Sequence, residues 1–467
     1  MKYDIICIGA GSGGLGTSMF MNKAGFKVLL IDKSDRSIGG DCLNHGCVPS
    51  KALIHSSRLV QGARESKEFG LKVDGKIDLA KVSRYVDDKR EVIREHENAN
   101  YLRKLGLDVV LGAAKFNSKN SVVVNGQEYF GKKIVIATGS RPMIPNIKGI
   151  EKIKYYTNEN IFELDKLPNK MIVIGGGPIG VELGQCFQRF GSEVIVIQRG
   201  PQFLPKEDVQ IADILRKRLE KEGMRFMFNT SPLEFTSKNE LIVEDKNGKK
   251  SKLKFDLVLV SAGRTLNIDN LYLDKAGIKV NESKIIVDNY LRTTNKDVLV
   301  IGDAAGSYQF THCAEIHVRL ILSNFFSPFK KKVSYDHLSW VTYTTPEVAT
   351  FGLNIEQLNQ RKIKYRILEK DFKDDDRAIV DNASYGKAKV YVDNKGKLLG
   401  GTMIAENAGE VFQELVLANS AGLNVNHLFS KIYPYPTASR INQAVVKPIF
   451  EGKLTPFVKK LFKLLYH

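Results

Sequence analysis

Residues 3–14 read Tyr-Asp-Ile-Ile-Cys-Ile-Gly-Ala-Gly-Ser-Gly-Gly, and this stretch decides the fold of the first part of the chain. The run before the glycines is typical of a buried parallel strand, and an apolar helix is expected after them. A second strand is expected over residues 27–31, and it ends at Asp32, which we expect to accept hydrogen bonds from a ribose. A strand, a glycine-rich turn, a helix and an acid about twenty residues further on predict a dinucleotide-binding unit. The turn glycines, against which the pyrophosphate is expected to rest, are Gly9, Gly11 and Gly14.

A second copy of the pattern begins at residue 171. A strand over residues 171–174 leads into the turn Gly175-Gly-Gly177-Pro-Ile-Gly180, and a helix and a strand over residues 193–197 follow. That strand ends at Gln198 with Arg199 beside it, where units that bind NAD carry an acid. Arginine suits the 2′-phosphate of NADP, so the pattern favours NADPH. The alternative is that Arg199 is a solvated surface residue.

Two cysteines, Cys42 and Cys47, lie five residues apart soon after the first glycine turn. In a regular helix five residues advance the chain by about 7.5 Å, beyond the roughly 4.4–6.8 Å that separates the Cα atoms of a disulfide. A disulfide here therefore requires a distorted turn, for which Gly46 supplies the flexibility. Because a strained disulfide is easily reduced, we interpret the pair as redox-active.

The alternatives for these cysteines are a zinc site or two unrelated buried thiols. Zinc would need two more ligands of similar spacing, and the other cysteines are single and scattered, so no metal site is expected. These other cysteines are Cys7, Cys186 and Cys313.

Two nucleotide units and a neighbouring dithiol together imply electron flow between nucleotide and sulfur. A flavin is the natural relay, because it accepts a hydride and can pass two electrons to a disulfide. Further strands run into turns at residues 134–142 and 298–306. Asp303 in the second stretch is expected at the carboxyl end of its strand, where ligands collect in open α/β sheets. The alternative is a helix N-cap.

Composition limits the remaining possibilities. A length of 467 residues predicts about three or four domains. Five cysteines, no signal-peptide pattern and no long apolar run favour a cytoplasmic protein. The net charge of +18 comes from lysines and arginines spread along the chain, often near acids, so we expect a solvated basic surface and no nucleic-acid binding.

The pattern changes from about residue 336, where β-rich segments and a helix occur without a nucleotide motif. This indicates an α+β domain of a different kind. The final residues, 454–467, form a short basic amphipathic segment. Such a segment either lies peripherally on a membrane surface or packs on its own domain.

On these motifs the chain resembles, over nearly its whole length, the class I flavoprotein pyridine nucleotide-disulfide oxidoreductases. That family includes dihydrolipoamide dehydrogenase, glutathione reductase and mercuric reductase. Besides the two glycine motifs, the matching stretches are Gly40-x-Cys42-Leu-Asn-x-Gly-Cys47-Val-Pro-Ser-Lys51, Ala137-Thr-Gly139, Gly263-Arg264 and Gly302-Asp303. The resemblance implies an α/β fold with two Rossmann-like domains, for FAD and for NAD(P), and a C-terminal α+β domain that forms a homodimer.

The resemblance also implies domain boundaries. They are 1–148 for the first part of the FAD-binding domain, 149–266 for the NAD(P)-binding domain, 267–335 for the second, central part of the FAD-binding domain, 336–450 for the dimerisation domain and 451–467 for the basic tail.

Residue roles follow from the same resemblance. Cys47 would lie next to the flavin, Cys42 would meet the substrate, and Lys51 would lie near flavin N5, paired with Glu182. The implied FAD-binding residues are Gly9, Gly11, Gly14, Asp32, Lys51, Ala114, Thr138, Gly139, Gly302, Asp303 and Thr311. The implied NAD(P)H-binding residues are Gly175, Gly177, Ile179, Gly180, Glu182, Gln198, Arg199 and Gly263.

The chain departs from the family near its C-terminus. Disulfide-reducing members carry a His-Pro-Thr-x-x-Glu motif there, whereas this chain has Tyr435 and Arg440 in place of the histidine and the glutamate. A phenol with a pKa of about 10 is a poor proton shuttle at neutral pH, which argues against dihydrolipoamide or glutathione chemistry. Tyr435 is nevertheless the candidate acid–base residue, with His45 as the alternative. Mercuric reductases add a C-terminal cysteine pair, but no cysteine follows Cys313.

The leading hypothesis is therefore an FAD-dependent NAD(P)H oxidoreductase that is mercuric-reductase-like. Its electrons would pass through the Cys42–Cys47 pair to an unidentified disulfide, metal ion or quinone. One rival is dihydrolipoamide dehydrogenase. Another is a redox sensor or electron-donating subunit docked to a membrane through residues 454–467.

Overall fold

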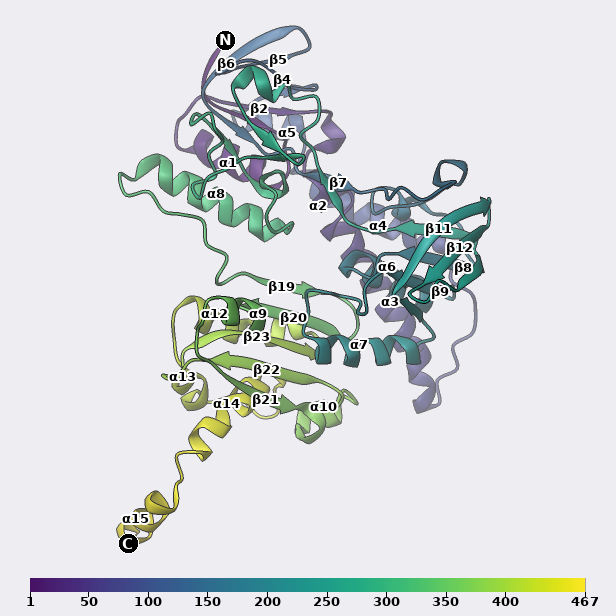
Figure 1. Cartoon of the computed structure of the whole chain (residues 1–467), viewed down its shortest axis with the longest axis vertical. Helices are drawn as coiled ribbons and strands as arrows, with labels where there is room; N and C mark the ends of the chain where they lie inside the picture. Colours follow the sequence, from purple (N-terminus) through teal and green to yellow (C-terminus); the bar gives the residue numbers. More distant parts are fainter. Residues whose placement is uncertain (467) are drawn as a thin grey trace. The chain divides into compact units, whose positions relative to one another are not determined.

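The computed structural model describes residues 1–466 and divides into two compact units (Figure 1). The first unit contains residues 1–199 and 226–333, and it holds both glycine motifs and the dithiol. The second contains residues 200–225 and the chain from residue 334 onward. Every helix that the structure describes within residues 1–466 is either too short or too polar to span a bilayer.

A seven-stranded sheet forms the centre of the first nucleotide unit. Its strand order is β3-β2-β1-β6-β5-β4, with β18 on the other side of β6. Strands β1, β2, β3, β6 and β18 run parallel, whereas β4 and β5 join antiparallel. Their bounds are β1 Lys2–Ile8, β2 Val28–Asp32, β3 Asp108–Leu111, β4 Lys115–Ser118, β5 Ser121–Val124, β6 Gln127–Ile136 and β18 Val298–Val300.

Both faces of this sheet are buried, as expected for parallel strands covered by helices. Along β1, Ile5 and Cys7 contribute to one apolar core, and Ile6 and Ile8 contribute to another on the opposite face. This two-sided burial explains why the strand reads as a continuous apolar run. The helices of this part of the unit are α1 Ser12–Lys23, α2 Gly40–Asn44, α3 Cys47–Glu65, α4 Leu79–Arg94, α5 Ala99–Lys104 and α8 Thr311–Phe326.

The second nucleotide unit is built on a four-stranded sheet of order β10-β9-β8-β14. A three-stranded antiparallel sheet and two short strand pairs complete the first compact unit. The four-stranded sheet and its helix are β8 Lys170–Ile174, α6 Pro178–Phe190, β9 Glu193–Gln198, β10 Arg225–Phe228 and β14 Leu257–Val260. The three-stranded sheet consists of β11 Thr230–Ser237, β12 Glu240–Asp245 and β13 Lys250–Lys254. In the two strand pairs, β7 Ser140–Pro142 pairs with β15 Arg264–Leu266, and β16 Val280–Asn281 pairs with β17 Lys284–Ile285.

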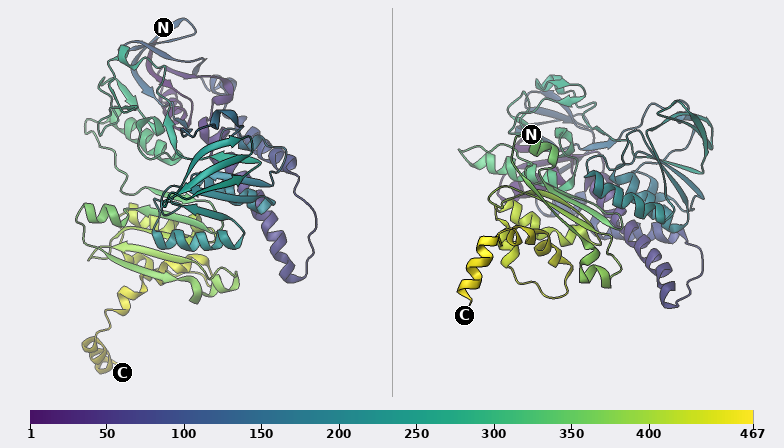
Figure 2. Two further views of the ribbon diagram at one scale, coloured as in Figure 1. Left: turned by 45° about the vertical axis from the view of Figure 1, so that its right-hand side comes forward. Right: turned by 60° about the horizontal axis from the view of Figure 1, so that its bottom comes forward.

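A five-stranded antiparallel sheet of order β19-β20-β23-β22-β21 forms the second compact unit. Helix α7 belongs to this unit (Figure 2), where Asp208 just before it pairs with buried Lys389 at 3.0 Å. The elements are α7 Val209–Lys221, β19 Ser339–Thr342, β20 Glu347–Gly352, α9 Ile355–Gln360, β21 Arg366–Asp371, α10 Asp376–Val380, β22 Lys387–Val392, β23 Leu398–Ala405, α11 Ala408–Val411, α12 Gln413–Ser420, α13 Val425–Ser430, α14 Ile441–Glu451 and α15 Pro456–Leu465. The fold class expected from the sequence is confirmed.

Candidate dithiol and dinucleotide site

The two cysteines lie on either side of a break between two helices. Cys42 lies in α2, Cys47 is the first residue of α3, and His45 and Gly46 separate the helices. A Cβ atom at Gly46 would lie 2.9 Å from the carbonyl oxygen of Asp41, so the break requires glycine. The turn is therefore distorted in the way that the cysteine spacing predicts, and both cysteines are present as thiols.

The surroundings of Cys42 and Cys47 shift the pKa values of the two thiols in opposite directions. A hydrogen bond from Cys42, a second contact with Thr311 Oγ1 at 3.3 Å and the positive charge of Lys51 lower the pKa of Cys47 to about 6. The same hydrogen bond, together with burial, raises the pKa of Cys42 well above its ordinary value. Cys47 also begins a 19-residue helix, whose N-terminus favours negative charge. These surroundings favour the thiolate form of Cys47 and the protonated form of Cys42.

An ion pair joins the dithiol helix to the second nucleotide unit. Lys51 Nζ on α3 lies 3.0 Å from Glu182 Oε2 on α6. Glu182 is only 5% exposed, and the ion pair with Lys51 offsets part of the cost of burying its carboxylate. The sequence-based pairing of these two residues is observed.

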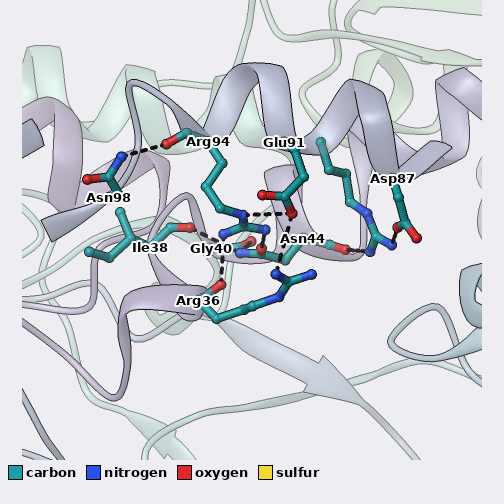
Figure 3. A network of polar contacts seen from close by, with 9 residues as sticks. Arg36, Ile38, Gly40, Asn44, Asp87, Glu91, Arg94 and Asn98 are labelled. Atoms are coloured by element: carbon teal, nitrogen blue, oxygen red, sulfur yellow. Dashed lines mark hydrogen bonds and ion pairs between the residues drawn. The ribbon is translucent and has the colours of Figure 1, made fainter. Parts of the chain in front are cut away.

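Arginines of α4 hold the segment between the cysteines (Figure 3). Arg90, which is buried, donates to the Asn44 backbone oxygen at 2.8 Å, and Arg94 donates to Asn44 Oδ1 at 2.6 Å. Asn44 in turn donates to the backbone oxygens of Ile38 and Gly40. Charge-assisted bonds of this kind are stronger than neutral ones. The helical turn that carries Cys42 is therefore fixed by two guanidinium groups.

Charged groups hold the other side of the segment. Arg264 Nη2 lies 3.1 Å from Asp41 Oδ2, and its Nε donates to Ser140 Oγ at 2.6 Å. Ser140 donates to Asp303 Oδ2 at 2.5 Å, and burial raises the pKa of Asp303. Asn158 Nδ2 donates to Asp41 Oδ1 and to the His45 backbone oxygen, both at 3.2 Å.

The first glycine turn forms a cradle that side chains would fill. A Cβ atom at Gly9 would lie 2.4 Å from the Ala137 carbonyl oxygen, and one at Gly14 would lie 1.8 Å from the Gly9 carbonyl oxygen. Asp32 accepts from the Ala10 amide at 2.5 Å. At Gly11, by contrast, a Cβ atom would meet only Gly40 Cα, at 3.6 Å, which leaves room for a ligand to approach the backbone.

The second glycine turn repeats this geometry. Cβ atoms at Gly175 and Gly180 would lie 2.4 Å from the Ser261 carbonyl oxygen and 2.3 Å from the Gly175 carbonyl oxygen, whereas one at Gly177 would have open space. Gln198 Oε1 accepts from the Gly176 amide at 2.9 Å. Within residues 1–466 no side chain caps the first amides of α1 or α6. Both helix N-termini therefore fit a dinucleotide pyrophosphate.

Other predicted cofactor residues lie at strand ends of the same compact unit. Thr138 and Gly139 follow β6, and their backbone oxygens accept from Asn267 at 3.0 Å. Gly302 follows β18 and donates its amide to His317 Nδ1 at 3.0 Å. Ala114 is buried between β3 and β4. The NAD(P)-unit residues are Ile179, half-buried in α6, Arg199, exposed after β9, and Gly263, which precedes β15 with φ +137°.

Tyr435 belongs to the second compact unit and is 65% exposed. Its hydroxyl donates to Asp376 Oδ2 at 3.2 Å, and the Arg440 guanidinium lies 5.0 Å from its ring centroid. The hydrogen bond to Asp376 raises the pKa of the phenol, which therefore stays protonated at neutral pH. The phenol can donate a proton or a hydrogen bond, but it is a poor base.

Several residues that hold the dithiol were missed by sequence reasoning. Arg264 belongs to a recognised motif, so its role could have been sought there. Asn44 lies inside the cysteine stretch, but nothing in the sequence links it to α4. The missed residues are Asp41, Asn44, Arg90, Arg94, Asn158, Ser140 and Arg264. Across residues 1–466, no group of three or more His, Cys, Asp or Glu side chains is arranged to hold a metal ion.

Comparisons with known proteins define the class. Residues 3–317 match the pyridine nucleotide-disulphide oxidoreductase family, and residues 338–445 match the dimerisation domain of the same family. The chain belongs to this family, and it is an FAD-dependent oxidoreductase that uses NAD(P)H and forms a homodimer.

Relatives within this family carry different names. The chain is 32% identical to a mercuric reductase of Bacillus cereus, over 93% of this chain and 69% of that protein. It is 31% identical to a dihydrolipoyl dehydrogenase of Buchnera aphidicola from Schizaphis graminum, over 100% and 99%. A solved structure, the Cu(II) complex of the HOCl-induced flavoprotein disulfide reductase RclA from Escherichia coli, matches with a TM-score of 0.85 and 27% identity, over 96% and 100%.

Proposed function

We propose that this oxidoreductase delivers electrons from NAD(P)H to its acceptor through Cys42 and Cys47. Cys47 is the thiolate that faces FAD, and Cys42 is the thiol that exchanges with the acceptor. The observation that carries this assignment is the position of Cys47 at the N-terminus of α3, with its sulfur 3.3 Å from Thr311 Oγ1. These surroundings lower the pKa of Cys47 and raise that of Cys42. When bound, FAD supplies the step that turns hydride transfer from the nicotinamide into two-electron reduction of a disulfide.

The cofactor contacts are proposed from the two cradles. Lys51, held by Glu182, supplies a cation on the dithiol helix. The residues proposed to hold FAD are Gly9, Gly11, Gly14, Asp32, Lys51, Ala114, Thr138, Gly139, Gly302, Asp303 and Thr311. The residues proposed to hold NAD(P)H are Gly175, Gly177, Ile179, Gly180, Glu182, Gln198, Arg199 and Gly263.

NADPH is proposed as the preferred nucleotide. Gln198 offers a neutral amide at the position where Asp32 offers a carboxylate, and Arg199 next to it is exposed. A neutral side chain does not repel a 2′-phosphate, and a guanidinium attracts one.

The acceptor is proposed to be a disulfide, a metal ion or a quinone. Proteins similar to this chain carry names that include a mercuric reductase and a disulfide reductase in complex with Cu(II). Dihydrolipoamide is disfavoured, because Tyr435 and Arg440 stand in place of the histidine and the glutamate. The hydrogen bond to Asp376 raises the pKa of the Tyr435 phenol, which therefore does not accept the proton of a dithiol.

The domain boundaries and the location of the protein are also proposed. The domains are 1–148 with 267–335 for FAD, 149–266 for NAD(P), 336–450 for dimerisation and 451–467 for the tail. The pairing of β18 with β6 supports the two-part FAD domain. A cytoplasmic location is proposed, with peripheral membrane contact through residues 454–467.

Steady-state assays test the electron route. Purified holoenzyme is assayed with NADPH and NADH against disulfides, metal ions and quinones, alongside Cys42→Ser and Cys47→Ser. We expect each variant to lose at least about 100-fold in kcat with the acceptor that supports turnover, because the thiol pair acts as a unit. The control Cys186→Ser alters a buried thiol in α6 and should keep most activity. Turnover that is unchanged in both active-site variants would refute the route.

A further inference from the structure

The C-terminal helix α15 is specified by its own sequence. Thr455 caps it, with Oγ1 accepting from the Val458 amide at 3.3 Å, and Pro456 occupies the first turn. Both are favourable helix-start signals. The helix extends over ten residues, or about 15 Å, and is therefore far too short to span a bilayer core of about 30 Å.

Apolar and charged side chains occupy opposite faces of α15. At about 100° per residue, the apolar side chains fall within an arc of roughly 160°, and the lysines fall within an opposite arc of roughly 100°. The apolar face consists of Phe457, Val458, Leu461, Phe462, Leu464 and Leu465, and the lysine face consists of Lys459, Lys460 and Lys463. With Lys453, residues 452–466 carry four positive charges and no acid.

The apolar face is open to solvent. No residue of α15 is buried, and Phe457 and Leu464 are 75% and 72% exposed. Figures 1 and 2 show the helix beyond α14, at the end of the chain. An amphipathic helix that packed on its own domain would bury this face. The structure therefore does not show α15 packed on the second compact unit, which was the alternative to a membrane surface.

We infer that α15 docks the enzyme onto the surface of a bilayer that contains anionic phospholipid. This inference rests on the peripheral membrane contact proposed above and specifies the class of lipid that is bound. It does not depend on which molecule accepts the electrons. The apolar face matches the depth of the headgroup–acyl boundary, and the lysines of the opposite, polar face complement anionic headgroups. A second copy is a poorer partner, because the matched dimerisation domain ends at residue 445, before α15 begins, and pairing of two apolar faces would give the lysines no acidic partner.

Co-sedimentation of the FAD-loaded full-length enzyme with vesicles tests this inference. Vesicles of phosphatidylcholine alone are compared with vesicles in which about one-third of the lipid is phosphatidylglycerol, at low and high salt. The wild type should bind the anionic vesicles preferentially and release in high salt. Each lysine near an anionic surface strengthens binding about fivefold, so Lys459→Gln, Lys460→Gln and Lys463→Gln together should weaken it about 100-fold.

Two further variants make the outcome decisive. Phe457→Ser with Leu461→Ser should abolish vesicle binding with all charges retained. The matched control, Lys238→Gln with Lys246→Gln and Lys249→Gln, removes three exposed lysines elsewhere and should bind like the wild type. Binding that is absent, equal for both vesicles, or unaffected by the tail variants would overturn the inference, as would a change in dimer mass in the apolar variant. NADPH oxidation with a soluble acceptor should be the same in all variants, so a failure here is separable from a failure of the electron route.

Discussion

The two glycine turns have almost the same backbone and different surroundings. Gly9 and Gly175 adopt φ +103° and +110°, and a Cβ atom at either would lie 2.4 Å from a carbonyl oxygen of the neighbouring strand end. In both turns an oxygen at the end of the second strand accepts a turn amide. That oxygen belongs to a carboxylate in Asp32 and to an amide in Gln198.

The neighbour of each turn differs as well. The amide of Gly39 donates to the Ala10 oxygen at 2.9 Å, and Gly40 packs against Gly11 so closely that a Cβ atom at Gly40 would lie 2.7 Å from Gly11 Cα. The dithiol segment thus rests on the first turn, while a Cβ at Gly177 in the second turn would meet open space. The backbone of both turns fits a dinucleotide, and the flanking residues, which differ, are the ones proposed to select the nucleotide. Only the first turn has the dithiol segment packed against it.

The largest effects are expected from alanine at the first glycine of each turn. Gly9→Ala should lower FAD affinity by at least about 100-fold, because strain at positive φ adds to a clash with backbone. Gly175→Ala should keep the flavin and lose NAD(P)H oxidation to a similar extent. Flavin absorbance after gel filtration and steady-state kinetics measure the two effects.

The control for these variants is Gly70→Ala, since Gly70 has φ +84° but open space around it. It should destabilise the fold by only about 1 kcal/mol and leave both cofactors bound. If both cradle variants lost FAD equally, the two turns would not serve separate nucleotides.

The next largest effects are expected from changes of charge at Asp32 and Gln198, which end β2 and β9. Asp32→Asn should weaken FAD binding about 10- to 100-fold, because a hydrogen bond to a charged group contributes roughly 1.5–3 kcal/mol. Gln198→Glu should lower the ratio of kcat/KM for NADPH to that for NADH at least about tenfold, through repulsion of the 2′-phosphate. Arg199→Ala, at an exposed position, should change the ratio less than about fivefold. A ratio unaffected by Gln198→Glu would contradict the NADPH assignment.

The next prediction concerns the arginines of α4, which hold the dithiol segment beside the first glycine turn. Arg94→Met removes the donor to Asn44 Oδ1 and should lower the free energy of unfolding by about 1–3 kcal/mol. If Arg94 positions the dithiol, the apparent pKa of Cys47 should also move upward from about 6. Arg36→Met, whose guanidinium is largely exposed in the same network, should cost less than about 1 kcal/mol and leave the thiol unchanged.

The smallest effect concerns the thiolate itself. In the reduced enzyme, alkylation of Cys47 by iodoacetamide should rise with pH through about 6, since the thiolate form dominates above its pKa. Thr311→Val removes one hydrogen bond to this sulfur and should raise the apparent pKa by about 0.5–1 unit. Alkylation that rises only near pH 9 would contradict a stabilised thiolate.

The fold and the cradles were predictable because local sequence determines them. Gly9, Gly14, Gly175 and Gly180 are positions where only glycine fits, and apolar runs mark the strands around them. The distorted turn at Gly46 was expected from the cysteine spacing on the assumption that Cys42 and Cys47 can form a disulfide.

The supports of the dithiol were not predictable in the same way. Arg90 and Arg94 lie more than forty residues after Asn44, and the sequence predicted only that lysines and arginines along the chain form a solvated surface. Only the packing of α4 on α2 brings them to the turn. The Asp376 partner of Tyr435 is a similar case, because no periodic pattern links residues 59 positions apart.

Anaerobic titration of the holoenzyme with NADPH tests the central claim, that electrons reach the Cys42–Cys47 pair and leave Cys47 as a thiolate against the flavin. We predict a long-wavelength absorption band, of the kind that a thiolate in contact with oxidised flavin produces, in the wild type and its absence in Cys47→Ser. Simple bleaching of the flavin without this band in the wild type, or identical spectra for the two proteins, would contradict the account.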